Sequence, residues 1–265
     1  MTVTQTDWKR PPVIEVVLGI QFAPIAGLTN GHLGWFWRSV EATYPRASDS
    51  APIQPVLESF EEEPEFGYHS IGFAQARGDS RLRMASVDGS RMLQAQNGWL
   101  VSNWVKRTEG PYPGYTGVLE QFQDGLGAFV GFLKERGLGE LAPNLWEVTY
   151  IDHIPRGTVW GDFEDLCKVV PGLLGASRSR YWRFQALGGT WGFQLKERPA
   201  RLAVTLQTAR STTDPPNDLL VVRSTARGRL DTLEALSESL NFGRAAVVGT
   251  FMDFTSNDAQ SYWKG

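Results

Sequence analysis

The alternation of apolar and polar positions near the start of the chain predicts a half-buried β-strand. In VIEVVLGIQF, residues 13–22, every even position is apolar, whereas Glu15, Gly19 and Gln21 occupy odd positions. A period of two directs alternate side chains toward the core of a sheet. The stretch LWEVTYIDHI, residues 145–154, carries a similar Glu-Val pair within a second apolar run. We therefore expect two related strands, one in each half of the chain.

The pattern after the first strand changes to helical spacing and then to short, turn-flanked runs. Residues 29–45 place apolar side chains on one helical stripe and end at a proline, which predicts a helix. Residues 46–55 are rich in Pro, Ser and Ala, which favours a surface loop. Turn signals such as Asp-Gly and Asn-Gly recur up to Val105 and are typical of an antiparallel meander. An apolar stripe over residues 116–137 then predicts a long helix.

The second half repeats this order of elements. It contains an opening strand, a short helical segment, a meander with a Gly-Gly hairpin turn and a long helix, over residues 145–154, 161–174, 180–225 and 231–254. Within the long helices, Leu119 and Leu126 match Leu233 and Leu240. The shared order predicts an internal duplication, with halves 1–140 and 141–265 packed as one globular unit.

This succession of elements predicts an α+β fold. Strand, helix, antiparallel meander and long helix, occurring twice, should build a curved antiparallel sheet with the long helices packed on one face. The two halves then join edge to edge into one continuous sheet. The alternative is a single helix-grip domain that wraps a cavity.

Composition and charge narrow the setting of the protein. The chain has 265 residues, of which 42% are hydrophobic and 12% aromatic, so it can bury a sizeable core. A net charge of −3 gives no general attraction for polyanions. Cys167 is the single cysteine, and neither a secretory leader nor a membrane-length apolar stretch is evident. We therefore expect a cytoplasmic protein without a membrane segment.

Asp152 is the most informative polar residue in the sequence. When the two strands are aligned by their Glu-Val pairs, Asp152 occupies the position that Ile20 has in the first strand, on the apolar face. A carboxylate there must be paired, hydrogen-bonded or protonated, because an isolated buried charge is costly. Tyr150 and Arg156 are close in sequence and, with Asp152, would form an acid/base set acting on a small substrate. The structural alternative is a carboxylate satisfied by a tyrosine hydroxyl, an arginine or backbone donors.

Aromatic and basic side chains supply further candidate binding residues. The stretch RSRYWRF, residues 178–184, could stack bases and neutralise phosphates, as single-strand nucleic-acid binders do. The structural alternative is a half-exposed strand whose arginine stems cover apolar surface. The candidate ligand-binding residues are Trp146, Arg180, Trp182 and Arg183. The leading hypothesis is a binding or interaction protein that holds a protein, peptide or apolar ligand in an aromatic-lined cleft or on a sheet face.

Motifs for metals, cofactors and nucleophilic catalysis are not evident. The histidines, His32, His69 and His153, lack the spacing of a metal site, and no nucleophile-elbow GxSxG is present. The glycine clusters GGTWG and GLGAFVG fit a hairpin and a helix better than a phosphate-binding loop. We therefore expect neither a metal nor a cofactor.

Three ordered motifs carry a resemblance to a known family. PPVIEVVLGIQF at residues 11–22, EVTYIDHI at 147–154 and VGTFMDFTSNDAQSYWKG at 248–265 together resemble a sporadically distributed, functionally uncharacterised bacterial family of proteins of about this length. The chain departs from that pattern at Thr149, where an arginine is usual, and at Asp152, where an asparagine is usual. The resemblance implies a patchily distributed gene, part of a mobile-element or defence-associated system, and brings no activity with it.

Overall fold

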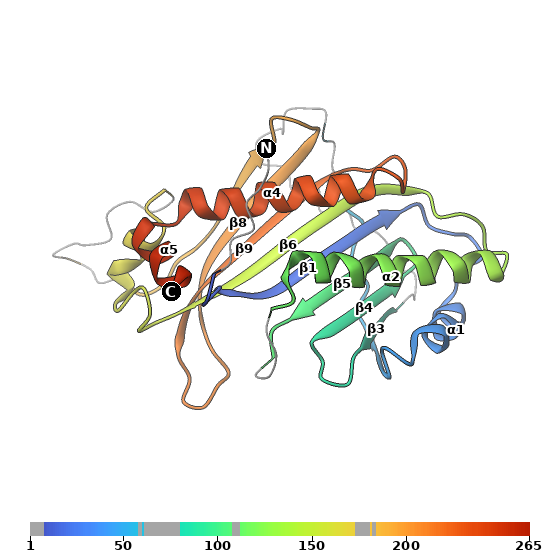
Figure 1. Ribbon diagram of the computed structural model, residues 1–265, viewed down its shortest axis with the longest axis horizontal. Helices are drawn as coiled ribbons and strands as arrows, with labels where there is room; N and C mark the ends of the chain where they lie inside the picture. The colour runs from blue at the N-terminus through green and yellow to red at the C-terminus, as the bar shows by residue number, and fades with distance from the viewer. Residues whose placement is uncertain (1–7, 58–59, 61–79, 108–111, 173–180, 182–183) are drawn as a thin grey trace.

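Antiparallel strands from both halves of the chain form one continuous sheet (Figure 1). The structure, a computed structural model, describes residues 8–57, 60, 80–107, 112–172, 181 and 184–265. Within these residues the nine strands are ordered β2-β3-β4-β5-β1-β6-β9-β8-β7. Their bounds are β1 Val13–Phe22, β2 Arg46–Ser50, β3 Arg81–Ala85, β4 Arg91–Gln96, β5 Trp99–Val105, β6 Pro143–Pro155, β7 Gly188–Gln194, β8 Ala200–Arg210 and β9 Asp218–Arg229. The predicted α+β class is confirmed.

The two predicted opening strands form the centre of this sheet. They are β1 and β6, which pair antiparallel with Val17 opposite Thr149 and Ile20 opposite Trp146. Val16, Leu18 and Ile20 are fully buried, as the period-two pattern predicts. The β1–β6 pairing is therefore the seam at which the two halves of the chain join.

Two long helices pack against strands of this sheet. α2, Gly114–Glu135, contacts β5 and β1, and α4, Leu236–Phe254, contacts β6 and β9 (Figure 1). Small residues allow the close approach, since a Cβ added at Gly243 would lie 2.4 Å from the Trp146 ring. α4 therefore packs tightly over the central strand of the second half. None of the helices in the described ranges is both long enough and apolar enough to span a bilayer.

Short elements complete the chain. After β1 comes α1, Asn30–Val40, with Thr29 at its N-cap, and after β6 come a 3-10 turn, η1, and a single helical turn, α3. α5, Asn257–Lys264, is the last helix and has Ser256 as its N-cap, whose hydroxyl accepts a hydrogen bond from the Ala259 amide. The bounds of η1 and α3 are Phe163–Asp165 and Leu166–Val169.

The structure corrects one predicted loop and one predicted hairpin turn. Arg46–Ser50, expected within a loop, forms edge strand β2 against β3; its side chains are largely exposed, so no apolar alternation marks the strand. Gly188 and Gly189, expected as a hairpin turn, begin β7 and pair with Gln207 and Leu206. The connection between β7 and β8 lies at residues 195–199 instead. The first error arises because the exposed side chains of β2 show no apolar pattern, and the second because glycine has no side chain that could mark a strand.

The start of the described chain is tied to its end. The Trp8 ring stacks on Trp263 of α5, with 5.6 Å between ring centroids, and the Arg10 amide donates a hydrogen bond to the Trp263 carbonyl oxygen over 2.9 Å. The His153 amide of β6 donates to the Pro12 carbonyl oxygen over 3.0 Å. These contacts hold residues 8–12 beside the end of β6, where the candidate site lies.

Candidate functional site

A cavity of about 500 Å³ lies between the start of α2 and the C-terminal half of α4. The ends of β5 and β6 and the segment 8–13 complete its walls. Most of the lining side chains are aromatic or aliphatic, among them Trp104, Tyr112, Tyr150, Val247, Val248 and Phe251. Its size is that of cavities that enclose small organic ligands.

Asp152 lines this cavity and is nearly inaccessible to solvent. Its side chain belongs to β6 and shares the buried face with Tyr150. Burial raises the pKa of Asp152 from 3.8 to about 7, and burial is the only cause of the shift. No side chain or backbone amide in the described part of the chain donates a hydrogen bond to the carboxylate. Asp152 therefore keeps its acceptor capacity for a group that enters the cavity.

Three buried hydrogen-bond donors without partners belong to residues that line the same cavity. Among the described residues, six buried side-chain nitrogen or oxygen atoms lack a partner, and the Trp8 Nε1, Tyr115 hydroxyl and Arg244 Nε atoms are three of them. Buried polar groups are paired in most folded proteins, so unpaired groups concentrated at one cavity indicate a missing partner. Arg244 lies over the Tyr115 ring, with 5.1 Å from its guanidinium carbon to the ring centroid.

Three tyrosines give the cavity a phenolic wall. The hydroxyl oxygens of Tyr112 and Tyr150 lie 3.5 Å apart, and the rings of Trp104 and Tyr112 have centroids 4.7 Å apart. Burial raises the pKa values of Tyr112, Tyr115 and Tyr150, while the nearby Arg244 charge opposes each rise. All three phenols are therefore protonated at neutral pH and can donate hydrogen bonds.

Charge at the cavity is predominantly positive. Lys9, Lys106 and Arg244 line it, whereas Asp152 is the one acidic residue among the lining residues that the structure describes. No ion pair joins any of the three cations to an acidic group within the described ranges. The N-terminus of α2, at Gly114, also faces the cavity and has neither an acidic residue in its first turn nor a capping side chain. Helix N-termini carry partial positive charge, which adds to that of the side chains.

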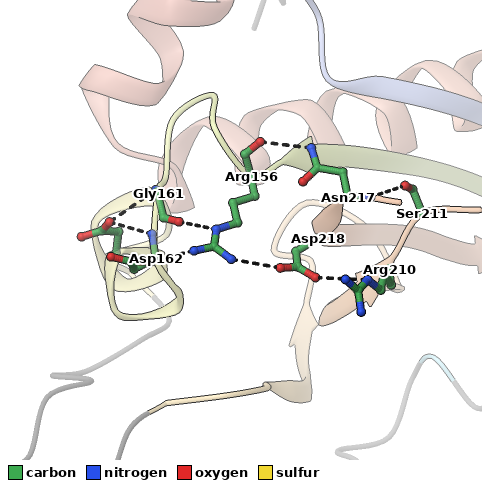
Figure 2. A network of polar contacts seen from close by, with 8 residues as sticks. Arg156, Gly161, Asp162, Arg210, Ser211, Asn217 and Asp218 are labelled. Atoms are coloured by element: carbon green, nitrogen blue, oxygen red, sulfur yellow. Dashed lines mark hydrogen bonds and ion pairs between the residues drawn. The ribbon is translucent and has the colours of Figure 1, made fainter. Parts of the chain in front are cut away.

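The structure brings together two members of the predicted acid/base set and separates the third. Tyr150 and Asp152 both line the cavity, whereas Arg156 follows the end of β6 and is absent from the lining. Figure 2 shows the Arg156 guanidinium held by Asp162 and Asp218, at 2.9 and 3.2 Å. The Arg156 side chain therefore stabilises loops outside the cavity.

The predicted ligand-binding residues do not meet at this site. Trp146 is buried beneath α4, where its ring fills the space beside Gly228 and Gly243, and it is not among the cavity-lining residues. Arg180, Trp182 and Arg183 lie outside the described residues. Within the described ranges, no three His, Cys, Asp or Glu side chains come together in a way that could hold a metal ion.

Sequence reasoning missed the cationic and phenolic side of the cavity. Tyr112 and Tyr115 belong to a Pro- and Gly-rich stretch that leads into the first turn of α2, and Trp8 precedes the first strand. Arg244 carried a usable signal, because it is a single charged residue within the apolar run of α4. A lone arginine on a helix that packs against a sheet must find either solvent, an acid or a ligand.

Comparisons with known proteins assign no function to this site. Neither the protein-family models nor the curated proteins include a match to the chain. The bacterial family that the sequence resembles therefore stays a prediction.

Proposed function

We propose that this protein binds a small organic molecule in the cavity between α2 and α4. The cavity combines about 500 Å³ of space with apolar, largely aromatic walls and a few polar groups, which is the usual composition of a ligand site. The leading hypothesis from the sequence is an aromatic-lined binding cleft, and we propose that this cavity is that cleft.

One observation carries the proposal: four residues that hold an unpaired polar group line a single cavity. Asp152, Trp8, Tyr115 and Arg244 each present a group without a partner in the described part of the chain. An unsatisfied buried group costs about 1–3 kcal/mol, and a ligand that pairs with several of them recovers much of that cost. A purely structural cluster would pair these groups with one another.

An uncharged fluorescent probe tests the proposal without knowledge of the natural ligand. N-phenyl-1-naphthylamine becomes fluorescent in apolar surroundings, and we expect one molecule to bind per chain. The substitution Val248→Trp places an indole in the cavity and should weaken the binding about tenfold or more. The matched control Val87→Trp alters an exposed loop residue, 76% accessible, and should leave binding unchanged. Equal binding by both variants would contradict the proposal.

A second candidate function is catalysis on the bound molecule. The observation that favours it is the pKa of about 7 for Asp152, which suits a group that both accepts and donates a proton near neutral pH. Tyr150, which also lines the cavity, would assist it, whereas Arg156 is engaged elsewhere. An enzyme would convert its substrate with a rate that changes near pH 7 and is lost in Asp152→Asn; a binding protein would release the ligand unchanged.

We also infer that the two halves, 1–140 and 141–265, are copies of one unit with α2 and α4 on the same face of the sheet. The register at the seam supports this, because Glu15 pairs with Ile151 and Gly19 pairs with Glu147. Aligning Glu15 with Glu147 also aligns Gly19 with Ile151, so exchanging the halves reproduces both pairs. The strands beside the seam follow matching orders, β5-β4-β3 and β9-β8-β7. β2 would then be an addition to the first copy.

The setting in which such a protein acts stays a prediction. A role in a mobile-element or defence-associated bacterial system rests on the family resemblance, and a cytoplasmic location rests on the composition of the chain. Single-strand nucleic-acid binding rests on Arg180, Trp182 and Arg183, which lie outside the described residues. The cavity supports the binding of a small ligand more directly than the binding of a nucleic acid or of a protein.

A further inference from the structure

We propose that the ligand of this cavity is a small organic anion with a flat apolar body, whose acidic group binds at Arg244 and whose hydroxyl or amine substituent binds at Asp152. This inference rests on the proposed binding function and specifies the chemistry of the ligand. It follows from the charges, the unpaired donors and the wall shape of the cavity, each of which restricts the ligand separately.

The charge of the ligand follows from the cations. Lys9, Lys106 and Arg244 line the cavity without an acidic partner in the described part of the chain, and the start of α2 adds partial positive charge. Lys9 and Lys106 are exposed and Arg244 is half-buried, so a cationic ligand would be repelled by this set and a neutral one would gain no attraction from it. An anion matches the field of the cavity as a whole.

The position of the acidic group follows from the unpaired donors. Arg244 Nε and the Tyr115 hydroxyl are both buried without partners, and the guanidinium lies over the Tyr115 ring. A guanidinium recognises the planar oxygens of a carboxylate or the oxygens of a phosphate through parallel hydrogen bonds. The stacked ring orients this group, so the acidic end of the ligand belongs at Arg244 and Tyr115.

The shape of the remaining body follows from the walls. Trp104 and Tyr112 pack with ring centroids 4.7 Å apart, and Tyr150 and Phe251 line the same space. Aromatic walls favour flat, apolar groups, which stack on ring faces or meet ring edges. The ligand body is therefore planar and apolar, and a flexible sugar or polyamine fits these walls poorly.

Asp152 defines a second polar contact. Its carboxyl group lines the cavity, has no partner in the described ranges and lies among the tyrosines. A hydroxyl or amine donor on the ligand would satisfy it, as buried carboxyl groups require. A ligand with an acid at one position and a donor at another occupies both polar parts of the cavity at once.

Isothermal titration calorimetry of the full chain with three matched probes tests the inference. The probes are 1-naphthoate, 1-naphthyl phosphate and neutral 1-naphthamide, which share one flat body and differ in the polar group. We expect the better of the two anions to bind at least about tenfold more tightly than the amide. Whichever anion binds more tightly tells whether the natural ligand is a carboxylic acid or a phosphate ester.

Substitutions at Arg244 connect the preference to one side chain. Arg244→Gln should weaken binding of the preferred anion at least about tenfold and change the amide by less than about twofold. Arg244→Lys keeps the charge and should retain intermediate affinity for the anion. The control Arg38→Gln alters an exposed arginine on α1 and should change nothing. Circular dichroism verifies that each variant is folded.

The outcomes separate the inference from the function beneath it. If the uncharged dye binds and is lost in Val248→Trp, but anion and amide bind equally, the cavity is a ligand site and the anion inference is wrong. An anion preference that survives Arg244→Gln also overturns it. If neither the dye nor any naphthyl probe binds the folded chain, both the inference and the proposed function are wrong.

Discussion

Asp152 and Arg156 are near neighbours in the sequence, yet their side chains belong to two polar clusters of opposite character. The Arg156 cluster is partly exposed, and its charges are paired: Asp162 and Asp218 flank the guanidinium, and Arg210 lies beyond Asp218 (Figure 2). At the cavity, the Asp152 carboxylate is buried and lacks a partner in the described part of the chain, as do the buried Trp8 Nε1, Tyr115 hydroxyl and Arg244 Nε atoms. The partly exposed charges of the Arg156 cluster could be solvated by water, yet they form ion pairs. The buried atoms at the cavity cannot be solvated in this way, yet they have no partner in the described residues.

This difference teaches how to distinguish a structural polar cluster from a site. Both clusters contain an arginine and a carboxylate, so residue type does not separate them. The Arg156 cluster connects the loop after β6 to the start of β9, with the Asn217 side chain also donating to the Arg156 carbonyl oxygen over 3.1 Å. Its bonds are complete without a ligand. Buried polar groups without partners whose residues line one cavity, in contrast, are candidates for contact with a ligand.

The largest expected effect is that of Asp152→Asn on stability. The carboxyl pKa is 3.8 in the unfolded chain and about 7 in the fold, so folding favours the protonated form. The folded state therefore loses stability as the pH rises from about 4 to about 7, by up to about 4 kcal/mol in total. Asparagine carries no charge and avoids this loss. We expect the variant to be more stable than the wild type at pH 8, by up to about 4 kcal/mol, and nearly equal to it at pH 4.

Urea denaturation of the ligand-free protein at both pH values measures this difference. Asp165→Asn serves as a control of opposite sign, because hydrogen bonds from the Lys168 side chain and the Asp162 amide lower the pKa of Asp165 to about 2. That variant should be less stable than the wild type at pH 8. A loss of stability in Asp152→Asn at pH 8 would mean that the carboxylate has a partner and that the two clusters are alike.

The same substitution in the other cluster should have the opposite sign. Asp218 accepts a hydrogen bond from Arg156 Nη1 over 3.2 Å and lies 3.9 Å from Arg210 Nε. Asp218→Asn weakens both ion pairs, and we expect a loss of about 1 kcal/mol in the free energy of unfolding, since partly exposed pairs contribute little. Binding of the naphthyl probes should stay unchanged. Urea denaturation and calorimetry of the variant measure the two quantities.

The matched control for this prediction is Asp253→Asn, an exposed position on α4. It should change stability by less than about 0.5 kcal/mol. A stabilising effect of Asp218→Asn would show that Arg156 and its partners are held at a net cost. The contrast between a satisfied structural cluster and an unsatisfied site would then fail.

The sequence predicted the strands and long helices because burial leaves a periodic record. The alternation in residues 13–22 and the apolar stripe of residues 116–137 correspond to β1 and α2. The same alternation placed Asp152 on the buried face, which the structure confirms. β2 left no such record, because its exposed edge position selects for no apolar residue.

The cavity itself could be predicted only in part. Tyr150 and Asp152 share one strand, so alternation alone placed them together. Trp8, Tyr115 and Arg244 come from three other segments, and their meeting depends on how α4 and the first described residues pack around the end of β6. Arg156 was predicted to act with Asp152 because the two are close in sequence. The chain turns after β6, however, and Arg156 binds Asp162 of the following loop instead. Two residues of one strand can be assigned to the same face from the sequence alone. The direction of a residue beyond the end of the strand cannot be predicted in this way.

The smallest expected effect is that of Tyr115→Phe on the ligand-free protein. The Tyr115 hydroxyl is buried without a partner, so its removal should raise the free energy of unfolding by about 1 kcal/mol, the low end of the cost of an unsatisfied buried group. Ser211→Ala in the other cluster removes a hydroxyl that accepts from the Asn217 amide over 2.8 Å and should cost about 1 kcal/mol. Urea denaturation of both variants decides the matter. A loss above about 1 kcal/mol in Tyr115→Phe would mean that its hydroxyl is already bonded in the free protein. It would then no longer be available to a ligand, and the contrast would rest on Asp152, Trp8 and Arg244.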